Sequence, residues 1–203
     1  AHNIAYENIH TELNVCIDSD DRIALGAVKK IRDTWEKVRN KEYAGMIALD
    51  ADFSGNIIGK GFPAGMGDTT LGGYYATGGS GDKKLIYRTD VINSVPPYPV
   101  FQGEKYVGLV YKYTLIDQKY KLYVMNEVVC EVEYQADGST GTMWKQYLQN
   151  PCGFAFLRKV AMQYPTSKKR LIRDCIHYCS SSQIAKNRSY IQESPHKFLT
   201  IIC

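Results

Sequence analysis

The chain has 203 residues and lacks several patterns that would define its class at once. It has no apolar run of the roughly 18 residues that a membrane-spanning helix requires. The segment that begins at Ala1 lacks the pattern of a secretory signal peptide. Glycine is dense between residues 54 and 82, yet the phosphate-loop motif G-x-x-x-x-G-K-[ST] is missing there. There is also no internal repeat, so the sequence predicts an ordinary globular fold rather than a repeat array or a P-loop protein.

Standard zinc spacing is lacking too, although the chain contains six cysteines at irregular intervals. Cys175 and Cys179 would share one face of a helix, but two further ligands at zinc spacing are not present. We interpret these two residues as core cysteines. A chain of this length does not need disulfides for stability, so its cysteines indicate a reduced, cytoplasmic compartment.

The composition is typical of a soluble α/β protein with a substantial core, because 44% of the residues are hydrophobic and 23% are charged. Phenylalanine is scarce, since six phenylalanines stand against sixteen tyrosines. Tyrosine combines a flat apolar ring with a hydroxyl group, which suits the surfaces of sugars and nucleotides. The same side chain suits half-buried structural positions, so the tyrosine content leaves both interpretations open.

The hydrophobic pattern predicts a strand at residues 13–17, a helix at 23–39 and a buried strand at 44–49. Strand, helix and strand in succession are typical of a mostly parallel sheet. Further along, the pattern predicts a strand at 84–88 and a helix at 104–117.

The last part of the chain changes in character. Residues 120–134 form two strand-like runs, and residues 136–139 predict a turn. Helical patterns broken by prolines follow. We therefore expect one domain over residues 1–150 and a helical extension over residues 151–203.

The tetrapeptide Asp18-Ser19-Asp20-Asp21 directly follows the first predicted strand. Three carboxylates this close together repel one another unless a cation is present, so the segment predicts a site for a hard divalent metal ion. Asp20 and Asp21 are the best candidates as its ligands. The alternative is an acidic turn that caps the helix starting near Ile23.

Three segments match known signatures in order and spacing. Residues 1–8 read AHNIAYEN and precede the strand that ends in D-S-D-D, residues 101–107 read FQGEKYV, and residues 150–155 read NPCGFA. The first arrangement resembles the A-x-N-x-A and D-S-D-D signature of family 2 glycosyltransferases with the GT-A fold. The other two resemble the F-x-G-E-K-[FY] and N-P-x-G-F-A elements of a bacterial branch of that family, of the cell-surface or capsular polysaccharide type.

The resemblance implies a GT-A-like α/β fold, with a mixed, mostly parallel sheet flanked by helices and a helical C-terminal region. It implies an enzyme that transfers a sugar from a nucleotide diphosphate sugar to a glycan or lipid-linked acceptor. The transfer would proceed with inversion and would need Mn²⁺ or Mg²⁺ at Asp20 and Asp21. Asp18 would contact the ribose or orient the turn, Asn3 would be structural or lie near the nucleotide, and Glu104 would be the catalytic base.

The chain departs from the family pattern in two respects. The family begins with a strand, helix and strand that carry much of the nucleobase site, and this chain starts later, so we expect a fragment that lacks part of the nucleotide pocket. Lys105 follows Glu104 where many relatives have two adjacent acids, which leaves an acid at a helix start as the alternative role of Glu104. Lys84 and Arg88 are candidates to meet a phosphate, with ordinary surface cations as the alternative.

Two other function classes remain open on the sequence alone. One is a transferase-like sugar or nucleotide-binding domain without activity, which would act as a scaffold. The other is a metal-dependent nucleotidyltransferase or phosphatase, in which the same aspartates would hold a metal ion beside phosphate.

Charge is distributed unevenly along the chain. Residues 1–150 carry 16 basic and 19 acidic side chains, a net charge of −3, whereas residues 151–203 carry 9 and 2, a net charge of +7. This basic segment predicts peripheral contact with an anionic membrane, at the inner face of the cell membrane, or a solvated helical face. No nucleic-acid-binding motif is present, so nucleic acid is not expected as a partner.

Overall fold

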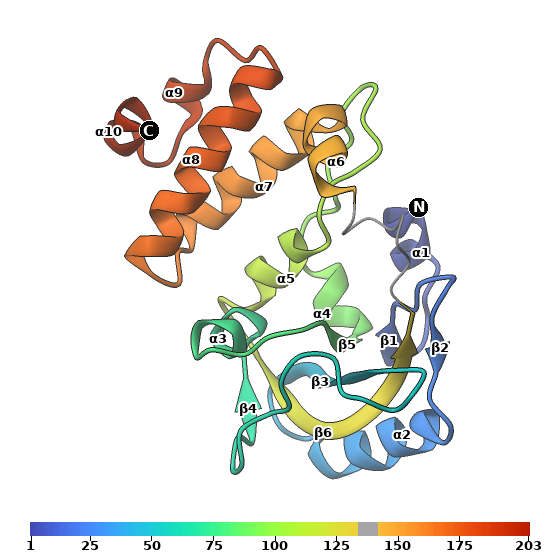
Figure 1. Ribbon diagram of the computed structural model, residues 1–203. Coiled ribbons are helices and arrows are strands. Elements are labelled where there is room, and N and C mark those ends of the chain that lie inside the picture. Colours follow the sequence, from blue (N-terminus) through green and yellow to red (C-terminus); the bar gives the residue numbers. More distant parts are fainter. Residues whose placement is uncertain (134–141) are drawn as a thin grey trace. The chain divides into compact units, whose positions relative to one another are not determined.

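The computed structural model describes residues 1–133 and 142–203, and Figure 1 shows its ribbon. The described residues form two compact units. Unit 1 comprises residues 1–96 and 115–133, and unit 2 comprises residues 97–114 and 142–203. The boundary expected at residue 150 thus falls inside unit 2, and the turn predicted at residues 136–139 lies outside the described residues.

Unit 1 is built on a mixed sheet, of which six strands lie in the described part of the chain. These strands are β1 (Leu13–Val15), β2 (Arg22–Ile23), β3 (Tyr43–Asp52), β4 (Asp68–Thr69), β5 (Lys83–Arg88) and β6 (Lys121–Val132). They follow the order β1-β5-β3-β6-β2, and β4 pairs with β6. Figure 1 shows β6 as one long, strongly curved strand where the sequence predicted two runs.

The mixed α/β character is confirmed, but the expectation of a mostly parallel sheet is wrong for the described strands. Only β3 and β6 pair in parallel, and every other pairing is antiparallel. The reason is that β5 inserts between β1 and β3 and runs opposite to both. A local strand-helix-strand pattern does not reveal such an insertion, because a later segment supplies the intervening strand.

Helix α2 (Ala27–Val38) covers one face of this sheet. Its buried residues Trp35 and Val38 pack against Met46, Ile86 and Val129. The helix starts later than the predicted 23–39 because β2 first pairs with the end of β6. Further helices of unit 1 are α1 (His2–Glu7), α3 (Leu71–Ala76) and α4 (Thr89–Asn93), and α5 (Val110–Ile116) contains the boundary between the units.

Unit 2 is helical over its described residues. Its helices are α6 (Met143–Gln149), α7 (Pro151–Gln163), α8 (Lys168–Ile184), α9 (Tyr190–Glu193) and α10 (Lys197–Ile202). Helices α7 and α8 pack along each other, and α10 packs against α8 and α9. Cys175 and Cys179 lie in the core of this unit beside Met162 and Tyr178, so their interpretation as core cysteines is confirmed.

The helix predicted at residues 104–117 is shorter than expected. It starts at Val110 in the structure, as α5, so Glu104 does not lie at the start of this helix. In residues 1–133 and 142–203, no helix is long and apolar enough to cross a membrane.

Candidate functional site

The D-S-D-D segment crosses the end of the sheet in unit 1. It connects β1 at one edge to β2 at the other, so it has to pass β5, β3 and β6. Neighbouring strands are about 4.8 Å apart, so this crossing spans roughly 19 Å on a flat sheet, which an extended chain of seven peptide units can reach. The backbone amide of Asp21 donates a hydrogen bond to the carbonyl of Asp18 at 3.1 Å, which fixes a turn within the crossing.

Asp21 meets residues from two strands at this end of the sheet. Its Oδ2 lies 3.5 Å from Nζ of Lys84 on β5, and the thiol of Cys130 on β6 donates to the same oxygen at 3.9 Å. The side chains of Lys84 and Asp21 are only 12% and 9% exposed. Water therefore screens this ion pair less than it screens a surface pair.

Asp50 on β3 adds a second buried carboxylate. The residue is 2% exposed, and its Oδ1 has no hydrogen-bond partner. Burial raises the pKa of Asp50 to about 6, which the nearby Lys84 ammonium opposes. An orphaned buried oxygen of this kind is costly, and it marks a place where a donor or a cation would be favourable.

Lys84 and Cys130 respond to the same neighbourhood. Burial alone would lower the pKa of Lys84, but Asp50, Cys130 and Asp21 raise it above its usual value. Burial raises the pKa of Cys130 to about 11, so its thiol stays protonated at neutral pH. We therefore treat Asp21, Asp50 and Lys84 as the charged members of this cluster, and call them the carboxylate–lysine cluster.

The structure brings Asp18, Asp20 and Asp21 into one turn with different exposures. Asp18 and Asp20 are exposed, whereas Asp21 is half-buried and faces the carboxylate–lysine cluster. Sequence reasoning missed Asp50, for which the available signal was an acid at the end of a buried apolar run.

Carboxylate oxygens are the ligands that Mg²⁺ and Mn²⁺ prefer, so the chemistry of this turn suits such an ion. Across the described ranges 1–133 and 142–203, no group of three or more His, Cys, Asp or Glu side chains is arranged to hold a metal ion. Mg²⁺ commonly takes one or two protein carboxylates and completes its shell with water and substrate phosphates. Asp20 and Asp21 are the two carboxylates of this turn that the sequence offers as ligands for such an ion.

Lys83 organises the glycine-rich segment next to this cluster. Its ammonium donates hydrogen bonds to the carbonyls of Ile58, Ser80, Gly81 and Asp82 at 2.9 to 3.3 Å. The residue is only 8% exposed. Four carbonyl acceptors account for its buried charge, so Lys83 fixes this segment in place and leaves Lys84 as the lysine that faces the carboxylates.

Arg88 and Asp90 lie at the other end of β5. Arg88 is four positions after Lys84 on this strand, a distance of about 13 Å. The Arg88 guanidinium pairs with the Asp90 carboxylate, and both residues line a pocket of about 710 Å³. Of the two cations considered for a phosphate, Lys84 is therefore the one beside the aspartates.

Asn3 lies on α1, away from the aspartate turn in the fold. Helix α1 packs against α4, which follows the Arg88 end of β5. Asn93 of α4 donates its side-chain amide to the carbonyl of Tyr6 at 3.2 Å and so ties the two helices together. The structure thus brings Asp21 together with Lys84, with Asp18 and Asp20 in the same turn, whereas α1 lies towards the opposite end of β5.

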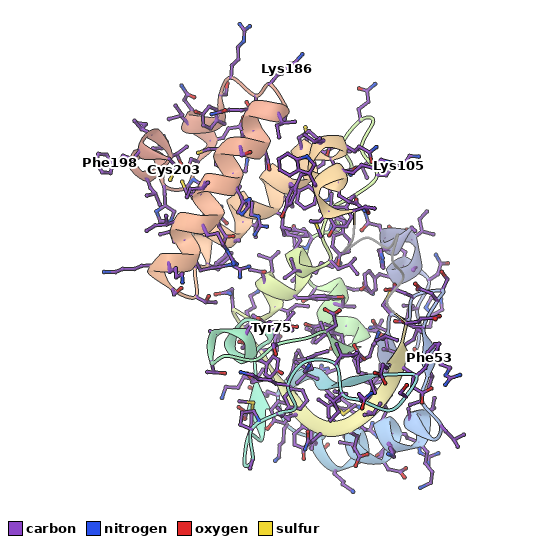
Figure 2. The ribbon with its side chains drawn as sticks, viewed as in Figure 1. Phe53, Tyr75, Lys105, Lys186, Phe198 and Cys203 are labelled. Carbon is purple, nitrogen blue, oxygen red and sulfur yellow. The ribbon has the colours of Figure 1, made fainter. Side chains whose placement is uncertain are left out.

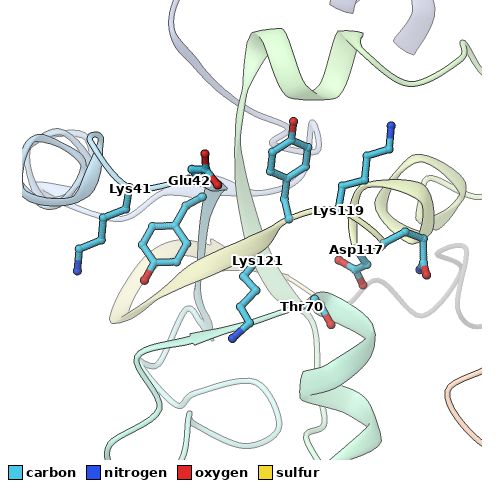
Figure 3. A pocket seen from close by; sticks show the side chains of 9 residues that line it. Lys41, Glu42, Thr70, Asp117, Lys119 and Lys121 are labelled. Carbon is cyan, nitrogen blue, oxygen red and sulfur yellow. The ribbon is translucent and has the colours of Figure 1, made fainter.

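A second pocket opens at the starts of β3 and β6 (Figure 3). It measures about 480 Å³, and its lining includes Lys41, Lys119 and Lys121. Lys121 pairs with Asp68 at 2.7 Å, and Asp117 accepts hydrogen bonds from the first amides of α3. Neither this pocket nor the one beside Arg88 includes the D-S-D-D segment.

Glu104 belongs to unit 2, where it binds the N-terminus of α7. Its Oε1 accepts a hydrogen bond from the Cys152 amide and its Oε2 one from the Gly153 amide, both at 2.7 Å. Free amides at a helix start attract a negative charge. Glu104 therefore does act as an acid at a helix start, which was its alternative role. The helix is α7, however, and not the helix predicted at residues 104–117.

Asn150 completes a reciprocal contact between the two segments of unit 2. Its Oδ1 accepts hydrogen bonds from the amides of Lys105 and Tyr106 at 2.8 and 3.1 Å. A side chain at Gly153 would place Cβ 2.2 Å from the carbonyl oxygen of Tyr106, so only glycine fits there. The segments FQGEKYV and NPCGFA, far apart in the sequence, thus form one packed motif.

No protein-family model matches this chain, and no curated protein sequence matches it.

Proposed function

We propose that this chain is the catalytic part of an inverting, metal-dependent glycosyltransferase of the family 2 type, with a GT-A-like fold. It would transfer a sugar from a nucleotide diphosphate sugar to a glycan or lipid-linked acceptor. The observation that supports this most directly is the Asp21 carboxylate. It lies in the turn that crosses the ends of β3 and β6, 3.5 Å from the Lys84 ammonium.

This arrangement suits the binding of a diphosphate. Asp20 and Asp21 would hold Mn²⁺ or Mg²⁺, which would neutralise the charge that grows on the leaving diphosphate. Lys84 supplies a further positive charge beside the same carboxylates. Asp18 is exposed at the start of the turn, where it can accept hydrogen bonds from ribose hydroxyl groups.

Glu104 remains our proposal for the catalytic base. In this role its carboxylate accepts the proton of the acceptor hydroxyl as that oxygen attacks the anomeric carbon. Each oxygen of Glu104 already accepts one backbone hydrogen bond, and a carboxylate oxygen has a second lone pair for the substrate. The helix α7 contact would hold the base in a fixed orientation.

The acceptor is proposed to be a glycan or a lipid-linked sugar at the inner face of the cell membrane. The exposed face of α8 supports this, because Lys169, Ile172, Arg173 and Ile176 lie at helical spacing and are all exposed. Exposed basic side chains attract anionic headgroups, and exposed apolar side chains beside them can be buried at the lipid interface.

Product analysis tests the proposed function. The full chain is incubated with a panel of nucleotide diphosphate sugars and Mn²⁺, and nucleotide products are separated by chromatography. Release of nucleoside diphosphate that stops in the Asp20→Asn and Asp21→Asn variants supports the proposal. Release of pyrophosphate would instead identify a nucleotidyltransferase. Metal-dependent retention of the nucleotide without turnover would identify a binding domain.

A further inference from the structure

The carboxylate–lysine cluster contains its own cation. Asp21 and Asp50 bring two negative charges to one end of the sheet, and Lys84 brings one positive charge. The Lys84 side chain is 12% exposed, so little water is available to replace the ion pair. When all three groups are ionised, the cluster keeps a net charge of −1.

The other charged or polar groups near this cluster have different partners or the wrong charge to pair with Asp21. Lys83 is bound by four backbone carbonyls, and Asp82 adds a further negative charge to the surroundings of Asp50. The Cys130 thiol is neutral and donates towards Asp21. Lys84 is thus the cation paired with Asp21, and the charges of Lys84 and Lys83 both lower the pKa of Asp50.

The orphaned oxygen of Asp50 shows that this neutralisation is incomplete. The residue is only 2% exposed, yet its Oδ1 has no hydrogen-bond partner. The Lys84 ammonium pairs with Asp21 at 3.5 Å and leaves this Asp50 oxygen without a donor. A bound cation would therefore stabilise the carboxylates of this cluster. A phosphate with more negative charge than Asp21 would compete with Asp21 for the Lys84 ammonium.

We propose that Lys84 is an internal competitor of the divalent metal ion: it pairs with the Asp21 carboxylate in the free protein and moves to the donor phosphate when metal and nucleotide bind together. This inference rests on the proposed metal and diphosphate site. It explains how metal binding becomes coupled to donor binding, because the nucleotide supplies a new partner for the displaced ammonium. Lys84 is a positioning residue in this scheme and takes no part in proton transfer.

The first test measures Mn²⁺ binding to the full chain without nucleotide, by calorimetry. Replacing Lys84→Gln should tighten Mn²⁺ binding by about tenfold or more, since an opposite charge at this distance shifts the cation affinity of a carboxylate by one or more orders of magnitude. The control is Lys30→Gln, which removes an exposed lysine paired with Glu127 on the same unit. Equal Mn²⁺ affinity in the Lys84→Gln and parent proteins would overturn the inference.

A second measurement covers the case in which Lys84→Gln fails to fold. The parent protein is labelled with ¹³C-lysine, and the Lys84 side-chain resonance is assigned through its loss in Lys84→Arg. Mg²⁺ with nucleoside diphosphate should shift this resonance, and nucleoside diphosphate with chelator should not. A Lys84 signal that stays unchanged at saturating Mg²⁺ and nucleotide would overturn the inference.

Neither measurement requires sugar transfer. Tighter Mn²⁺ binding in Lys84→Gln together with no transferase activity would reject the proposed function and keep the role of Lys84. Transferase activity in the parent protein, with an unchanged Mn²⁺ affinity in Lys84→Gln, would keep the proposed function and reject the role of Lys84.

Discussion

The Glu104 carboxylate accepts a hydrogen bond from the backbone amide of Gly153 at 2.7 Å, and its other oxygen binds the neighbouring amide of Cys152. This contact joins two segments of unit 2 that the sequence separates. It gives Glu104 a structural role that can be measured independently of any activity.

We expect Glu104→Gln to lower the free energy of unfolding by about 1 to 2 kcal/mol, because the amide keeps one acceptor and loses the charge that binds the start of α7. Urea unfolding followed by circular dichroism measures this. The control is Glu36→Gln on α2, which replaces an exposed acid paired with the exposed Arg39 and should change stability little. A Glu104→Gln protein as stable as the parent would contradict the capping role.

The catalytic role of Glu104 makes a separate forecast for the same variant. Sugar transfer should fall by about 10²- to 10⁴-fold, while nucleotide binding is preserved, as expected for the loss of a positioned base. Transfer at near the parent rate would remove Glu104 from the reaction. Asp90 is the next candidate for the base, and it lies at the Arg88 end of β5, away from Asp21.

Gly153→Ala should destabilise the protein by roughly 2 kcal/mol or more, because the new methyl group would overlap the Tyr106 carbonyl in a packed contact. Backbone has to move to relieve this overlap, since the distance would be 2.2 Å. Gly61→Ala is the matched control, because a Cβ there meets nothing within 4 Å. Thermal unfolding of both variants checks the forecast, and equal melting temperatures would refute it.

Metal and nucleotide should bind together at the aspartate turn. We expect nucleoside diphosphate to bind about 5- to 150-fold more tightly with Mn²⁺ than with chelator, the usual range for two coupled ligands. Asp21→Asn should abolish this difference. Asp33→Asn, which replaces a half-buried acid of α2 paired with Lys29 and Arg32, should preserve it. Calorimetry that finds equal affinity with metal and with chelator in the parent protein would reject the site.

Asp117 should make stability fall as the pH rises between about 4 and 6. Burial raises the pKa of Asp117 from 3.8 to about 6, although the Gly72 and Leu71 amides oppose this shift. In this range the folded state keeps a proton that the unfolded state has lost, so deprotonation favours unfolding. Asp117→Asn should remove about 1 to 3 kcal/mol of this pH dependence, measured by urea unfolding at several pH values. An unchanged pH profile would show that Asp117 titrates normally.

Four basic residues of the C-terminal quarter differ in whether they pair with a buried acid. Arg158 and Arg170 both pair with the buried Asp174, so their charges are partly neutralised, although the Arg170 side chain stays exposed. Lys169 and Arg173 remain exposed on α8 beside exposed Ile172. The predicted lipid contact is thus narrowed to this face.

Full-length chain should sediment with anionic vesicles at low salt and should release them as salt rises. Lys169→Gln with Arg173→Gln should weaken binding by roughly 30-fold, at about 1 kcal/mol for each basic residue near the lipid surface. The paired control is Lys186→Gln with Arg188→Gln, which removes two exposed charges outside this α8 face. Equal sedimentation with anionic and neutral vesicles would mean that the face is only solvated.

Exposed apolar residues give the vesicle experiment a further internal comparison. Phe198 on α10 is 79% exposed (Figure 2). If α8 alone carries the lipid contact, Phe198→Ser should bind vesicles as the parent does.

The sequence alone determined the features that depend on neighbouring residues. Alternating and continuous apolar patterns predicted the strands within β3 and β5, and the helical spacing of Cys175 and Cys179 predicted their burial in unit 2. These signals are local, because side-chain periodicity follows directly from backbone geometry. The acidic tetrapeptide at the end of the first strand was visible for the same reason.

Only the tertiary structure decided which distant residues meet. The insertion of β5 between β1 and β3 brings Lys84 to Asp21, and this strand order also makes the sheet largely antiparallel. Glu104 was expected at the start of its own helix, but the chain brings the start of α7 to it instead. Such pairings depend on long-range packing and hydrogen bonding between segments, which no local pattern in the sequence encodes.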